Sequence, residues 1–156
     1  MLSAALHLYL RMWEQQSGIP VDVELKKSVF KKKGWFNGYK AHFNDSLSID
    51  FASGPANLGM LEELVLARNR IEHPSVISNH RTNYTDLDLE KRPHPFFVDE
   101  REAALFADIN NGEISWLIPP TLHITADKLL TSIAEVDIFA EWFDEKIEEC
   151  IYPLRA

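Results

Sequence analysis

Residues 58–74 read LGMLEELVLARNRIEHP, and this stretch decides much of the fold. Its apolar residues recur at helical spacing, which predicts a helix from about Leu58 to Glu72. Pro74 should end that helix, because the residue before a proline is pushed out of α geometry. The helix end gathers three chemically useful side chains: Arg68, Asn69 and His73. A guanidinium, an amide and an imidazole form a compact set that can bind a phosphate and move a proton beside it.

The segment ARNRIEHP resembles the R-N-x-x-x-H signature of the HEPN superfamily (higher eukaryotes and prokaryotes nucleotide-binding). These are small all-α domains that often act as metal-independent ribonucleases. The wider layout is also similar, with an early helix, a helix that ends in the motif and a long C-terminal helix. The six-residue motif is the specific part. The resemblance implies a mainly α, HEPN-like bundle of four to five helices, formed as a single domain by residues 1–156.

Composition is typical of one globular domain with a packed interior. The chain has 156 residues, of which 46% are hydrophobic and 26% charged. A lone cysteine, Cys150, excludes an internal disulfide framework and fits a reducing compartment. The first sixteen residues do not read as a signal peptide, and no apolar run is long enough to span a bilayer. We therefore expect a cytoplasmic protein without a membrane segment.

The net charge of −8 counts against a protein that coats nucleic acid nonspecifically. Six of the nine lysines nevertheless lie within fifteen residues, interleaved with aromatic residues: Lys26, Lys27, Lys31, Lys32, Lys33 and Lys40. Candidate RNA-binding residues are Lys31, Lys32, Lys33 and Arg70. The alternative is that the lysines form a solvated helix face and that Arg70 is a surface charge.

Periodicity predicts the remaining helices. One covers residues 3–16, and another covers residues 23–43 with a break or bend at Gly34 and Gly38, where glycine disfavours helix. The last helix covers about residues 126–149, and its apolar residues form a stripe that needs a partner surface.

Two segments lack a helical period. Residues 74–100 are polar and contain prolines, which predicts a long loop or irregular insertion of unassigned role, with TDLDLE (85–90) as an exposed extended segment. Residues 105–109 and 114–118 flank Asn-Asn-Gly-Glu, which predicts a small β-hairpin insertion near 105–118.

The chemistry of the motif suits RNA cleavage without a metal. The RNA 2′-hydroxyl attacks the adjacent phosphorus, so the reaction needs proton transfer and positive charge on the phosphate. His73 can transfer the proton, Arg68 can bind phosphate oxygens, and Asn69 can orient His73 or donate to a phosphate. One chain supplies one such histidine, and the family resemblance implies a homodimer that places two motifs in one cleft. Local alternatives are a helix-capping His73 and an i,i+4 ion pair between Arg68 and Glu72.

Two functions from different classes remain open. The first is a metal-independent endoribonuclease of the toxin or defence kind, with an antitoxin protein as a partner. The second is a non-catalytic HEPN-like module that binds a nucleotide, RNA or a protein. A plain scaffold remains if the motif is buried. No cofactor is expected, and His80 and His94 lack the companions of a metal site.

Overall fold

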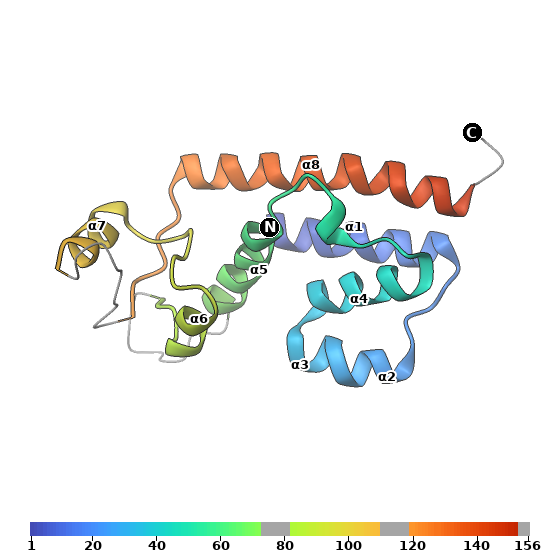
Figure 1. Ribbon diagram of the computed structural model, residues 1–156, viewed down its shortest axis with the longest axis horizontal. Coiled ribbons are helices and arrows are strands. Elements are labelled where there is room, and N and C mark those ends of the chain that lie inside the picture. The colour runs from blue at the N-terminus through green and yellow to red at the C-terminus, as the bar shows by residue number, and fades with distance from the viewer. Residues whose placement is uncertain (73–81, 110–118, 153–156) are drawn as a thin grey trace. The chain divides into compact units, whose positions relative to one another are not determined.

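The computed structural model describes residues 1–72, 82–109 and 119–152, and this part of the chain is mainly helical (Figure 1). The mainly α expectation is therefore confirmed. None of the described helices is both long and apolar enough to cross a membrane.

The chain divides into two compact units. The first comprises Met1–Glu62 and Ile133–Ala156, and the second comprises Glu63–Ser132. Both boundaries fall inside helices, α5 (Leu58–Glu72) and α8 (Ala126–Ile151). The expectation of a single domain stays a prediction.

The first unit contains the N-terminal helices and most of α8. Besides those parts of α5 and α8, its elements in chain order are α1 (Leu2–Ser17), α2 (Val23–Leu25), the π-helical turn η1 (Lys26–Phe30), α3 (Lys31–Lys33), α4 (Trp35–Leu47) and the 3-10 turn η2 (Phe51–Ser53). The prediction of helix over residues 3–16 is confirmed, and so is that of a helical run from residue 23 with an interruption.

The two glycines of the 23–43 region play different roles. Gly34 lies between α3 and α4 with a φ of 86°, a conformation that suits glycine and ends the first helical run. Gly38 instead lies inside α4, where the Phe30 ring packs directly against its backbone. A Cβ atom at Gly38 would overlap that ring. The expectation that Gly38 breaks the helix was wrong, because close side-chain packing rather than chain reversal requires the glycine.

An aromatic cluster forms the core of the first unit. Five of its rings are almost completely buried: Phe36, Phe43, Phe51, Phe139 and Phe143. The Phe51 and Phe139 rings lie edge to face with centroids 5.0 Å apart, a favourable geometry for aromatic pairs. Truncation of one such buried ring to alanine typically costs about 3–5 kcal/mol. The cluster therefore ties α4 and η2 to α8.

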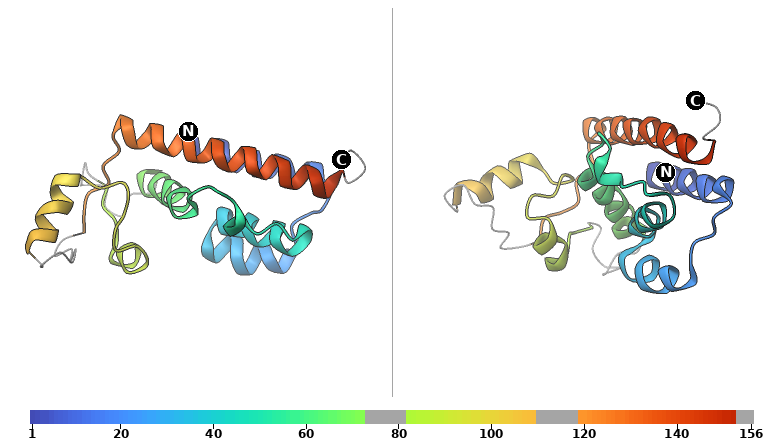
Figure 2. Two further views of the ribbon diagram at one scale, coloured as in Figure 1. Left: turned by 45° about the horizontal axis from the view of Figure 1, so that its top comes forward. Right: turned by 45° about the vertical axis from the view of Figure 1, so that its right-hand side comes forward.

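Helix α1 runs beside the C-terminal part of α8, as the views of Figure 2 also show. The Tyr9 hydroxyl and the Trp13 indole N–H both donate to Asp144 Oδ1, at 2.6 and 2.8 Å. Burial, followed by the hydrogen bond to Asp144, raises the pKa of Tyr9 far above its usual value. These two bonds satisfy the partly buried carboxylate.

The apolar stripe predicted on the last helix is only partly buried within the chain. Val136, Phe143 and Ile147 are buried, whereas Leu129 is 42% exposed and Ile133 is 36% exposed. The C-terminal part of the stripe therefore packs inside the first unit, whereas Leu129 and Ile133 at its start are exposed.

The second unit contains the end of α5, α6 (Asp86–Lys91), α7 (Glu100–Ile109) and the first turns of α8. An isolated antiparallel bridge joins Asn83 to Thr121, with the Leu122 N–H donating to the Thr82 carbonyl at 2.7 Å. The Lys128 ammonium donates to the carbonyl of Val98. Backbone pairing and this lysine therefore fasten the segment before α8.

The hairpin prediction was wrong for residues 105–109, which belong to α7. Asp99 accepts a hydrogen bond from the Arg101 N–H at 2.8 Å, and Glu100 and Glu102 lie in the first turn, which together favour a helix start. The short apolar run at residues 105–109 suggested a strand, but the capping signal upstream of it favours a helix. The other half of the predicted hairpin, residues 114–118, lies outside the described residues. Among those that are described, the bridge at Asn83 is the sole β pairing.

Candidate functional site

Helix α5 presents two of the three motif residues near its C-terminal end. The helix spans Leu58–Glu72, as its apolar spacing predicted. Leu61 and Ala67 are buried, at 0% and 2% exposed. Arg68 and Asn69, which follow Ala67, are only partly buried. His73 lies outside the described residues, directly after the last helical residue.

Arg68 contacts two neighbours on its own helix. Its Nη1 donates to Asn69 Oδ1 at 3.2 Å, and its Nη2 lies 2.6 Å from Glu72 Oε2. The side chains of Arg68 and Glu72 are 38% and 46% exposed, so solvent screens this i,i+4 ion pair. The guanidinium and the amide of the motif thus lie together, and the half-exposed Glu72 carboxylate partly neutralises the guanidinium. The local alternative of an Arg68–Glu72 pair is observed.

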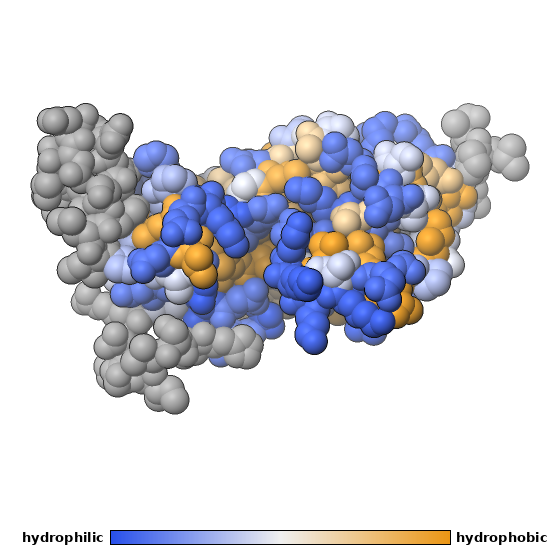
Figure 3. All heavy atoms as spheres, turned by 60° about the horizontal axis from the view of Figure 1, so that its bottom comes forward, coloured by the Kyte–Doolittle hydropathy of each residue, from blue (hydrophilic) through white to orange (hydrophobic). Residues whose placement is uncertain are grey.

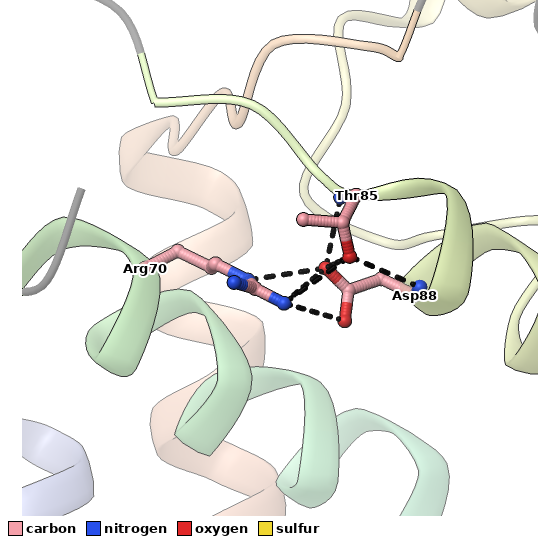
Figure 4. A network of polar contacts seen from close by, with 3 residues as sticks. All are labelled: Arg70, Thr85 and Asp88. Carbon is pink, nitrogen blue, oxygen red and sulfur yellow. Dashed lines mark hydrogen bonds and ion pairs between the residues drawn. The ribbon is translucent and has the colours of Figure 1, made fainter. Parts of the chain in front are cut away.

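Arg70 has a structural partner that the sequence analysis did not identify. Its Nε donates to Asp88 Oδ2 at 3.1 Å and its Nη2 to Asp88 Oδ1 at 3.0 Å, a bidentate arrangement (Figure 4). The same Nη2 lies 3.2 Å from the Thr85 hydroxyl oxygen. These side chains are mostly buried, at 29% exposed for Arg70 and 11% for Asp88. Arg70 is therefore not a simple surface charge, and its RNA-binding role stays a prediction that requires the guanidinium to leave Asp88.

The Asp88 carboxylate is held in its charged form by this network. Burial alone would raise its pKa, but hydrogen bonds from Arg70 and from the backbone and hydroxyl of Thr85 outweigh that effect and lower it. Asp88 also completes a capping box, in which the Thr85 hydroxyl accepts from the Asp88 N–H and the Asp88 carboxylate accepts from the Thr85 N–H. One carboxylate therefore both starts α6 and anchors it to α5.

Helix α6 corrects the expectation of an extended TDLDLE segment within the long loop or irregular insertion predicted over residues 74–100, of which residues 74–81 lie outside the described residues. Residues Asp86–Lys91 are helical. The available sequence signal was Thr85 followed three residues later by an acidic residue, a spacing typical of a helix start. Alternation of acidic residues with leucines suggested an extended segment, but the capping box at Thr85 favours a helix over so short a stretch.

Glu63 is a buried acid that the sequence analysis did not single out. It lies on α5, is 6% exposed, and accepts from the Phe96 N–H at 2.6 Å and from the Tyr84 hydroxyl at 3.4 Å. Burial raises the pKa of Glu63 above its usual value, against the opposing effect of the Phe96 hydrogen bond. Burial, with the nearby Glu63 charge, also raises the pKa of Tyr84. The hydrogen bond from the Phe96 N–H to Glu63 therefore anchors the segment before α7 to α5.

No protein-family model matches this chain, and no curated protein or solved structure matches it significantly. The resemblance of residues 68–73 to the HEPN signature therefore rests on the sequence pattern. The geometry adds that Arg68 and Asn69 share one accessible helix end.

Five of the six clustered lysines are exposed, whereas Lys40 is 34% exposed and its ammonium lies 3.6 Å from Glu62 Oε1. Lys31, Lys32 and Lys33 form α3 and are all exposed, while Phe36 and Tyr39 on α4 are buried. The surface that includes α2 and α3 comes forward in Figure 3, where many hydrophilic residues are visible. This arrangement is the one expected of a solvated helix face with its aromatic residues in the core. It equally leaves three ammonium groups accessible to phosphates.

Within the described ranges, no three His, Cys, Asp or Glu residues form a group that could hold a metal ion. His94 is exposed in the segment between α6 and α7, and His80 lies outside the described residues. Cys150 is exposed, and its Sγ lies 3.7 Å from the Leu47 carbonyl oxygen.

Proposed function

We propose that this chain is a metal-independent endoribonuclease of HEPN type, a toxin or defence nuclease with Arg68, Asn69 and His73 as its site. It works as a homodimer that brings two motifs into one cleft, within a HEPN-like bundle. An antitoxin protein is the partner that such a toxin requires.

The observation that carries this proposal is the end of α5. The Arg68 guanidinium contacts Asn69 Oδ1 at 3.2 Å and is 38% exposed, and the chain continues directly into His73. Arginine's planar fork suits two phosphate oxygens at once. A phosphate must displace Glu72 from Arg68, which is inexpensive because exposed ion pairs contribute about 1 kcal/mol at most.

In the reaction, the RNA 2′-oxygen forms a bond to phosphorus and loses its proton to a base. The bond from phosphorus to the 5′-oxygen breaks, and that oxygen receives a proton. The products are a 2′,3′-cyclic phosphate and a free 5′-hydroxyl. A histidine suits each proton role, since its pKa lies near neutrality. His73 supplies one role and His73 of the partner subunit the other, while Arg68 stabilises the charge on phosphorus.

A non-catalytic module that binds a nucleotide, RNA or a protein is the second candidate. The observation in its favour is the net charge of −8, which disfavours broad contact with RNA.

Cleavage of a fluorescent RNA by wild-type protein and by three single variants separates the two functions. For the nuclease, Arg68→Ala and His73→Ala should each reduce the rate at least about a hundredfold, as expected for loss of an acid–base or charge-stabilising group. His94→Ala is the matched control and should have little effect, because this histidine is exposed outside the motif.

RNA that is bound but never cut would refute the nuclease and support the binding module, provided that Arg68→Ala abolishes binding and His73→Ala preserves it. Unfolding of both variants would show instead that the motif is structural. Glu72→Gln sharpens the test: it releases Arg68, so it should increase RNA affinity severalfold, by about the worth of an exposed ion pair.

A further inference from the structure

A pocket of about 420 Å³ lies in the first compact unit and is lined by residues of α2, η1 and α4. Part of its wall is apolar: Ile19, Pro20 and Leu25. Three carboxylates also line it: Asp22, Glu24 and Asp45. The pocket therefore combines apolar surface with negative charge.

A buried histidine with an unused nitrogen contributes to the same pocket. His42 is 3% exposed, and its Nε2 has no hydrogen-bond partner among the residues that the structure describes. A buried polar atom without a hydrogen-bond partner destabilises the folded state by about 1–3 kcal/mol, so a ligand that bonds to this atom gains that energy on binding. The electrostatic effects of Glu14, Asp45 and Lys26 also act on the ring.

Burial lowers the pKa of the His42 ring below its usual value and so favours the neutral form, although the charge of Glu14, a hydrogen bond with the Ile19 backbone and the charge of Asp45 act in the opposite direction. A neutral imidazole has one nitrogen that donates and one that accepts. When Nδ1 carries the proton, Nε2 is an acceptor that can bind an N–H group.

The carboxylates differ in their availability. Asp22 Oδ1 accepts from the N–H groups of Glu24 and Leu25, at 2.8 and 3.1 Å, and so caps α2. Glu24 pairs with Lys27 at 3.1 Å. Asp45 accepts only a long 3.5 Å bond from Asn44 among the hydrogen bonds of the described residues. Asp45 is therefore the carboxylate best able to take a new cationic partner.

The wall of the pocket also contains an unusual piece of backbone. Ser28, one of the lining residues, belongs to the π-helical turn η1 (Lys26–Phe30). Such turns are rare and occur frequently at functional sites. The described residues offer no three-ligand group for a metal ion, which leaves an organic cation as the better match to the lining.

We propose that this pocket binds a small aliphatic amine. Its ammonium group donates to Asp45 and, once the His42 ring turns toward the pocket, to His42 Nε2, and its carbon chain lies against Ile19 and Leu25. The lining residues of this pocket include none of the residues proposed for RNA cleavage, so each proposal can fail without the other.

The test is a titration of the full chain with 1,4-diaminobutane, followed by the NMR resonances of the His42 ring. A saturable shift at millimolar or lower amine is expected. Asp45→Asn should lower the affinity for the amine at least about tenfold, because it removes one charge-assisted hydrogen bond. Asp45 is exposed, so this variant should fold normally.

Two matched controls make the result decisive. Asp137→Asn removes the same charge from an exposed position on α8 and should leave the affinity unchanged. The uncharged analogue 1,4-butanediol should give no saturable shift at the same concentrations. The proposal is overturned if the diol binds as well as the diamine, if the two variants weaken binding equally, or if His42 shows no saturable response and the pocket holds only water.

Discussion

Replacement of Arg70 by Gln measures how strongly α6 is anchored to α5. The change removes the two bonds of 3.1 and 3.0 Å to Asp88 and leaves the carboxylate with Thr85. Loss of one partner of a fully buried pair costs about 3–5 kcal/mol, whereas exposed pairs are worth about 0.2–1 kcal/mol. With Arg70 29% and Asp88 11% exposed, we expect a loss of about 2 kcal/mol in the free energy of unfolding.

A double-variant cycle isolates the pair itself. Urea unfolding, followed by far-ultraviolet circular dichroism, would be measured for Arg70→Gln, Asp88→Asn and the double variant, and we expect a coupling energy of about 1.5 kcal/mol. Because the pKa of folded Asp88 is lowered, this stabilisation is present above the unfolded value of 3.8 and is lost as the pH falls through the folded value.

Arg68→Gln is the control, because it removes the same charge from the same helix but breaks an exposed pair. Arg68→Gln should lower the free energy of unfolding by less than about 0.5 kcal/mol. Equal losses for Arg68→Gln and Arg70→Gln, or a coupling energy near zero, would show that the bidentate contact does not stabilise the fold.

Three further outcomes are expected. Light scattering at micromolar concentration should give the mass of a dimer, and a strict monomer would remove the composite site. RNA cleavage should persist in excess EDTA and leave 2′,3′-cyclic phosphate ends; activity restored only by added magnesium would contradict the mechanism. Finally, burial raises the pKa of Glu63 above 4.5, so its stabilising effect is present below pH 4.5 and is lost as the pH rises through the folded pKa. Glu63→Gln should therefore flatten the pH dependence of urea unfolding in that window, and an unchanged profile would argue against this origin.

Local sequence signals predicted the long helices well. The bounds of α5 follow from apolar spacing, and the start of α8 follows from Thr125, whose hydroxyl oxygen accepts from the Lys128 N–H at 3.2 Å. A cap and a repeating apolar face act within a few residues, so they can be read from the chain alone.

The partner of Arg70 and the burial of His42 could not be predicted in the same way. Arg70 binds an acid eighteen residues away, and His42 is buried by segments on both sides of it in the chain. Such contacts depend on how helices pack. Helix α6 could have been found from Thr85 and Asp88, because the capping signal is local even though the anchoring to Arg70 is not.

The packing of Phe30 against Gly38 has a consequence for the variation this fold can accept. Because a Cβ at position 38 would occupy the space of the ring, the two positions cannot change independently. A chain with alanine at 38 should need a smaller residue at 30, and a chain that keeps phenylalanine at 30 should keep glycine at 38. Among related sequences, paired substitution at these positions would be the evolutionary trace of this contact.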